Sequence, residues 1–224
     1  LLLIAPLCVT LQATVIPYDF PEDFPVSESY RVKIDEHAIT PLQTKKGAIL
    51  NFGMSAPVRV KVQLDETPKE VVIRPLHAGI KAKIKGRAFS FELPKPMNLS
   101  VEVDGDLEDP LLVFANPKEL NPPSKDDPKV KYFEAGKIHQ EDEIFLSSGE
   151  TLYMEPGAVV NAVVRAVDAR NVAIRGAGIL NAGYRKHKIN QLVLRECVGA
   201  RLENFIILDT LGWTIHLSGS EDVS

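Results

Sequence analysis

Two similar stretches decide the fold: TLYMEPGAVV at residues 151–160 and NVAIRGAGIL at residues 171–180. In each, apolar residues alternate with other residues along a short segment that ends in a glycine turn. Aligning Leu152 with Val172 gives an offset of 20 (172 − 152). A third copy begins at Ala200, an offset of 28 (200 − 172), and a fourth opens at Val223, an offset of 23 (223 − 200). The chain therefore repeats at a short period, as stacked β coils do.

This repeat predicts a parallel β-solenoid. Short strands and glycine turns with no helical pattern between them are typical of that architecture. Leucine-rich repeats share the period but require a leucine spacing that is absent here, and propeller blades need a period about twice as long. Each coil leaves an apolar face that only the next coil covers, so the copies must stack. In register with Leu152 and Met154, six side chains should point inward: Val172, Ile174, Ala200, Leu202, Phe205 and Ile207.

The N-terminal half predicts a different β domain. Its apolar residues follow a period of two, as where Val58, Val60 and Val62 alternate with Arg59 and Lys61. Half-buried strands of this kind, separated by turns rich in proline, glycine and aspartate, are typical of an antiparallel β-sandwich. We expect this sandwich to occupy residues 14–120, in a chain whose fold class is all-β.

A change of composition marks the boundary between the two domains. The stretch NPPSKDDP at residues 121–128 has almost no apolar content, and its prolines favour an extended path. We interpret it as a linker, with Asp126 and Asp127 as solvated side chains and not as a catalytic pair. Residues 129–224 then form the start of a right-handed parallel β-helix.

The segment at residues 1–13, LLLIAPLCVTLQA, is apolar and uncharged. It is too short for a membrane span of about 20 residues and is similar to the later part of a secretory signal, with cleavage after Ala13. We therefore expect a signal-peptide remnant and a secreted or periplasmic protein; a buried N-terminal strand is the alternative. Without this segment Cys197 is the one remaining cysteine, so no disulfide is expected and Cys197 should be a small buried side chain.

Composition and charge restrict the partners. Hydrophobic residues make up 45% of the 224 residues, and the net charge is −4. These values are ordinary for a globular protein, and they do not favour nucleic acid, which calls for a basic surface. The five histidines are scattered and no paired-cysteine spacing occurs, so no metal site and no cofactor are expected. We expect a monomer without a membrane span.

Four phrases in order carry a family resemblance: YFEAG at 132–136, LYMEPGAVV at 152–160, IRGAGIL at 174–180 and GWTIH at 212–216. Together they resemble secreted glycoside hydrolases of the pectin-lyase-like right-handed β-helix class. Dextranase and isopullulanase are similar in having an N-terminal sandwich, and polygalacturonases share the Gly-x-Gly and Trp-x-x-His phrases. The resemblance implies hydrolysis of O-glycosyl bonds in a polysaccharide.

The same resemblance implies where the catalytic acids lie. In these hydrolases they follow the Trp-x-x-His phrase, in an Asn-x-Asp-Gly stretch and an Asp-Asp pair, and neither follows that phrase here. The catalytic residues are therefore unknown and are expected beyond Ser224. The sequence is interpreted as an N-terminal fragment that is inert by itself.

Several residues are candidates for contact with carbohydrate. The polar insert at residues 184–190 combines aromatic and hydrogen-bonding side chains on a loop, and loops on rigid scaffolds often bind ligands. Asp209 precedes the turn before the Trp-x-x-His phrase, where it could instead cap backbone amides. Trp213 could stack on a sugar ring or pack inside the coil, and His216 could belong to the packed ladder. The predicted set is Tyr184, Arg185, His187, Asp209, Trp213 and His216.

Two other functions remain open. A β-helix polysaccharide lyase would need an acidic Ca²⁺ site and a basic residue for proton abstraction. A carbohydrate-binding or adhesive surface protein without catalysis is equally compatible with the predicted fold. Fold analogy alone does not decide between these and the hydrolase.

Overall fold

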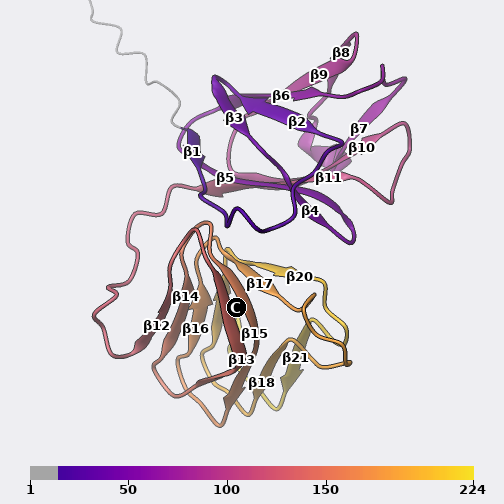
Figure 1. The fold of residues 1–224 in the computed structure, drawn as a ribbon. Coiled ribbons are helices and arrows are strands. Elements are labelled where there is room, and N and C mark those ends of the chain that lie inside the picture. The colour runs from indigo at the N-terminus through magenta and orange to yellow at the C-terminus, as the bar shows by residue number, and fades with distance from the viewer. Residues whose placement is uncertain (1–14) are drawn as a thin grey trace, which may run out of the picture.

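The computed structural model describes residues 15–224, which form an essentially all-β structure with one short 3-10 turn at Leu76–Ala78 (Figure 1). The predicted signal segment at 1–13 lies outside the described residues. No helix among those residues is long and apolar enough to cross a membrane.

The N-terminal half contains two sheets. One has the order β1-β5-β11-β10-β7, with β4 beside β5, and the other has the order β3-β2-β6-β9-β8. The strands of the first sheet are β1 Val15–Pro17, β4 Leu42–Thr44, β5 Gly47–Met54, β7 Val71–Arg74, β10 Met97–Val103 and β11 Leu111–Pro117. Those of the second are β2 Arg31–Ile34, β3 His37–Ile39, β6 Val58–Gln63, β8 Lys83–Lys85 and β9 Ala88–Leu93.

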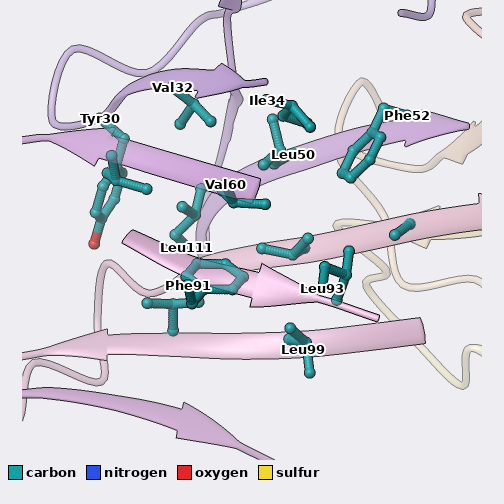
Figure 2. Close-up of a cluster of buried hydrophobic side chains, with 14 of the residues drawn as sticks. Tyr30, Val32, Ile34, Leu50, Phe52, Val60, Phe91, Leu93, Leu99 and Leu111 are labelled. Carbon is teal, nitrogen blue, oxygen red and sulfur yellow. The ribbon is translucent and has the colours of Figure 1, made fainter. Parts of the chain in front are cut away.

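Both N-terminal sheets contribute side chains to one hydrophobic cluster. Figure 2 shows Val32 and Val60 of one sheet near Leu50 and Leu111 of the other, and all four are buried. The predicted alternation is confirmed in β6, where the three valines are buried and Arg59 and Lys61 are exposed.

One expectation for this half is wrong, because the first sheet is mixed and not antiparallel throughout. Strands β5 and β11 pair in parallel. Strand β5 is buried along its whole length, with Leu50 and Phe52 in the N-terminal cluster and Ile49 in a second cluster on the opposite face. A strand covered on both faces shows no period of two, so sequence alternation could not identify its partner.

The C-terminal half contains two sheets in which every pairing is parallel. One has the order β12-β14-β16-β19, and the other β20-β17-β15-β18-β21 with β13 beside β15. The first comprises β12 Val130–Phe133, β14 Thr151–Met154, β16 Ala173–Arg175 and β19 Arg201–Glu203. The second comprises β13 Ile138–Leu146, β15 Val159–Val167, β17 Ile179–Asn181, β18 Leu192–Arg195, β20 Ile206–Leu208 and β21 Ile215–Ser218.

The observed register corrects the first repeat offset. Leu152 pairs with Ile174, an offset of 22 (174 − 152), and not with Val172. The next offset is confirmed, since Ile174 pairs with Leu202, an offset of 28 (202 − 174). An even shift keeps every side chain on its predicted face, so the burial pattern alone could not detect the error.

The six side chains expected to point inward do share one cluster with Leu152 and Met154. Val172, Ile174 and Ala200 are buried in it, and Leu202, Phe205 and Ile207 pack against it. Cys197 is also buried there, as predicted.

A ladder of amide side chains supports the parallel register. Asn161 Nδ2 donates to Gln140 Oε1 at 2.9 Å, and Asn181 Nδ2 donates to Asn161 Oδ1 at 2.8 Å. These three residues are register partners on β13, β15 and β17. Because each amide serves as donor or acceptor for its neighbour, the ladder opposes a slip of one strand past the next.

The two halves meet along a strand flank. Leu42 and Ile49 of the N-terminal half share a buried cluster with Val159 and Ile179 of the C-terminal half. Beside it, Asn51 Nδ2 donates to the carbonyl oxygen of Ala177 at 3.0 Å. The chain between β11 and β12, where the linker was predicted, contains no strand.

Candidate functional site

A row of side chains on the outer face of the β20-β17-β15-β18-β21 sheet carries the candidate site. Phe145 pairs with Arg165, Arg165 with Val193, and Val193 with His216. We call these four residues the outer ladder. Because side chains alternate along a strand, Phe145 faces outward while its neighbours on β13 are buried, and 61% of Phe145 is exposed.

Polar contacts fix the middle of the outer ladder. Arg165 Nε lies 2.9 Å from Glu143 Oε1, and another guanidinium nitrogen of Arg165 donates to the carbonyl oxygen of Asn190 at 2.9 Å. The Asn190 Oδ1 atom accepts a hydrogen bond from the backbone N–H of Trp213 at 3.1 Å. Its amide nitrogen lies 3.4 Å from Nδ1 of His216. Asn190 therefore connects three coils at one point.

The aromatic residues predicted near this point do come together. The rings of Trp213 and His216 meet edge to face with centroids 5.3 Å apart. The Trp213 side chain is 67% exposed, so the alternative in which it packs inside the coil is wrong. His216 is half-buried in the ladder. Together with Phe145, Trp213 places an exposed aromatic surface at each end of the row.

The insert at 184–190 folds back on strand β13. Arg185 Nε donates to the hydroxyl oxygen of Tyr184 at 2.8 Å, and that hydroxyl donates to the Glu141 carbonyl oxygen at 3.4 Å. A further guanidinium nitrogen of Arg185 donates to the carbonyl oxygen of Asp142. Both carbonyls belong to a bulge in β13 between Gln140 and Glu143. The predicted loop is thus held beside the outer ladder.

The remaining two predicted residues, His187 and Asp209, take less part in the contacts around the outer ladder. His187 is exposed on the insert, and no hydrogen bond joins its side chain to another residue in the described part of the chain. Asp209 follows β20 with a positive φ of 52°, as is common for turn aspartates. It lies at the base of the insert, since a β-carbon added to Gly183 would be 2.9 Å from Asp209 Oδ2.

Sequence reasoning missed Phe145, Arg165 and Glu143. The signal for Phe145 was present, because Phe145 occupies the outward position between two buried apolar neighbours. Arg165 and Glu143 become recognisable only when the register places β13 beside β15.

A groove distinct from the outer ladder lies between the two halves, and sequence reasoning missed it entirely. Residues 118–122, here called the strap, pass along the β12-β14-β16-β19 sheet and close a groove of about 650 Å³. Glu119 of the strap accepts a 2.6 Å hydrogen bond from the Tyr153 hydroxyl and forms an ion pair with Arg175. Tyr132 lies on the same face, with its ring centroid 4.9 Å from that of Tyr153. The strap is therefore bound to the sheet and is no free tether.

Burial in this groove makes its phenols hard to ionise. Desolvation, opposed by a hydrogen bond to Asn116, raises the pKa of Tyr18 to about 12. Desolvation and the carboxylate of Glu155 raise the pKa of Tyr132 to about 12. Desolvation and the hydrogen bond to Glu119 also raise the pKa of Tyr153. The groove thus keeps its tyrosines neutral up to a higher pH than exposed tyrosines.

These pKa values predict how stability depends on alkaline pH. In the folded protein the pKa values of Tyr18 and Tyr132 lie above the unfolded value of about 10. Their contribution to the free energy of unfolding is therefore complete below pH 10 and is lost as the pH rises towards 12. We expect urea midpoints to fall between pH 10 and 12, and to fall less in the Tyr18→Phe/Tyr132→Phe variant. Tyr184→Phe, which removes a tyrosine outside the groove, is the control. If the urea midpoint falls equally steeply with pH in the double variant and in the unmodified protein, the raised pKa values are wrongly assigned to Tyr18 and Tyr132.

No family model matches the sequence, and no curated protein matches it. Among residues 15–224, no group of three or more His, Cys, Asp or Glu side chains is arranged to hold a metal ion.

Proposed function

We propose that the protein is a secreted or periplasmic polysaccharide-degrading glycoside hydrolase that holds its glycan along the outer ladder. In this proposal the N-terminal half is a β-sandwich and the C-terminal half is the beginning of a right-handed parallel β-helix. Two sheets that share one core support the first assignment, and parallel pairing at repeated offsets supports the second. The right hand is the one that parallel crossovers adopt almost without exception.

One observation carries the binding assignment. Phe145 and Trp213 are exposed at the two ends of a row whose middle consists of Val193 and Arg165, the latter fixed by polar contacts. Parallel strands lie about 4.8 Å apart, so the three steps from Phe145 to His216 extend roughly 14 Å. Aromatic faces at such a separation suit the apolar faces of sugar rings, while Arg165 and His216 can bond to hydroxyl groups.

The proposal gives the outer ladder a binding role and not a catalytic one. Glycoside hydrolysis requires two carboxyl groups at a defined separation. Glu143 lies against the ladder, and it is already engaged in an ion pair with Arg165. We therefore expect the outer ladder to bind dextran, pullulan or polygalacturonate without itself releasing reducing ends, so that the hydrolytic carboxyl groups of the proposed enzyme lie elsewhere.

Affinity electrophoresis tests the binding role. We expect migration to be retarded in gels that contain at least one of these three polysaccharides. The double variant Phe145→Ala/Trp213→Ala should bind at least about tenfold more weakly, as loss of buried aromatic anchors usually does. Leu76→Ala is the matched control, because Leu76 is 66% exposed and far along the chain in the N-terminal half. Equal retardation of the unmodified protein, the double variant and Leu76→Ala would show that the outer ladder does not bind the polysaccharide.

A further inference from the structure

The outer face of the β3-β2-β6-β9-β8 sheet carries a row of lysines. Lys33 of β2 pairs with Lys61 of β6, Lys61 with Ser90 of β9, and Ser90 with Lys83 of β8. All three lysines are exposed, and Lys33 and Lys61 alternate with residues buried in the N-terminal core. At about 4.8 Å per strand, the row covers roughly 14 Å. We call it the lysine row.

A second cationic row lies beside the first. Arg31, Gln63, Ala88 and Lys85 are register partners across the same four strands, two residues along each strand. Arg31 is paired with Asp65. In the described part of the chain, no ion pair reaches the three lysines of the lysine row or Lys85. This face is therefore positive on a chain whose net charge is −4.

The fold itself gives no reason for this arrangement. Lys33 and Lys61 stand directly opposite each other on antiparallel strands, where like charges are destabilising. Other positions on the same face show the stabilising alternative, since Arg59 on β6 lies opposite Glu92 on β9 and the two form an ion pair at 2.7 Å. Opposed, unpaired lysines become favourable when an anion lies between them.

We propose that the lysine row binds a carboxylated polysaccharide chain laid across the strands. The partner is a polyanion, because the three cations lie along a line across four strands, with Ser90 between Lys61 and Lys83. The residues between them, Ser90 and Ala88, are small, so an extended chain can lie flat against the sheet. Lysine ammonium groups bind carboxylates as point charges. Single-stranded nucleic acid is disfavoured, because neither row supplies an aromatic platform for bases and Arg31 of the second row is already paired with Asp65. This site is separate from the outer ladder and does not depend on the proposed function.

Retention on polygalacturonate-coated beads tests the lysine row, with dextran-coated beads as the neutral comparison. We expect the unmodified protein to be retained on polygalacturonate at low salt and released at about 0.5 M NaCl, where exposed charges are screened. The variant Lys33→Gln/Lys61→Gln/Lys83→Gln should bind at least about tenfold more weakly. Lys33→Arg/Lys61→Arg/Lys83→Arg, which keeps the charge, should bind like the unmodified protein.

A matched control carries the same change of charge elsewhere. The variant Lys45→Gln/Lys46→Gln/Lys69→Gln replaces three exposed lysines in turns outside the sheet face and should lose less than about twofold. Thermal unfolding of each variant shows whether it is folded. The proposal is overturned if the unmodified protein is not retained, if both glutamine variants lose binding equally, or if beads carrying duplex DNA retain the protein more tightly than polygalacturonate does. The three lysine-to-glutamine changes should weaken retention by the same factor in a Trp213→Ala background as in the unmodified protein, which separates the lysine row from the outer ladder.

Discussion

Replacement of Gly176 by alanine is expected to lower the free energy of unfolding of the C-terminal half by more than about 4 kcal/mol. Gly176 has a φ of +105°, and a β-carbon at this position would lie 2.0 Å from the carbonyl oxygen of Met154 on the preceding coil. Neither atom can move cheaply, because the carbonyl oxygen is part of the Met154 backbone and the β-carbon would be bonded directly to the Gly176 backbone. Such a clash separates the coils, and the buried apolar face between them loses its cover.

Gly105→Ala is the control for the backbone conformation alone. Gly105 also has a positive φ, +75°, but a β-carbon there would meet nothing within 4 Å. Its replacement should cost only about 1–2 kcal/mol, the usual penalty for a side chain in the left-handed region. Urea denaturation of the two variants measures the difference. Similar losses for Gly176→Ala and Gly105→Ala would show that the coils are not in close contact at Met154.

The register of the parallel strands leads to the second large effect. Leu152 and Ile174 are fully buried register partners, so Leu152→Ala and Ile174→Ala should each cost about 2–5 kcal/mol. Because the two side chains stack in one cluster, the double variant should depart from additivity by about 0.5–3 kcal/mol. The pair Leu152→Ala and Val172→Ala, which the sequence alignment would match, should show a smaller coupling.

A distant pair provides the reference for that comparison. Val101 is fully buried in the N-terminal cluster, so Leu152→Ala and Val101→Ala should be additive within about 0.5 kcal/mol. Equilibrium denaturation in urea gives all three couplings. If Leu152 couples to Val172 more strongly than to Ile174, the register offset of 22 is wrong.

The sequence predicted those strands in which burial is one-sided. Val58, Val60 and Val62 of β6 alternate with charged residues because one face of the strand meets the core and the other meets water. Strand β5 carries no such signal, since Ile49 and Leu50 are buried on opposite faces. Its position between two clusters is a property of how the halves pack. Its parallel pairing with β11 therefore became apparent only from the structure.

The candidate site was predicted in part for a similar reason. Trp213 and His216 belong to one short phrase, and the insert at 184–190 interrupts the repeat, so both are visible in the sequence. Arg165 and Phe145 join them only through the pairing of strands that lie on different coils. Glu119 could not be predicted either, because its contacts with Tyr153 and Arg175 depend on the path of a strap that has no periodic pattern.

The central claim is that a glycan lies along the outer ladder, and titration of Trp213 fluorescence tests it most directly. Trp213 is the only tryptophan in the sequence, so any change in tryptophan emission reports on this position. With oligosaccharides from dextran, pullulan and polygalacturonate, we predict a saturable change for at least one series. The midpoint should shift to higher concentration in Phe145→Ala and stay unchanged in Leu76→Ala. Emission that remains constant with all three series, or a midpoint that does not respond to Phe145→Ala, would contradict the claim.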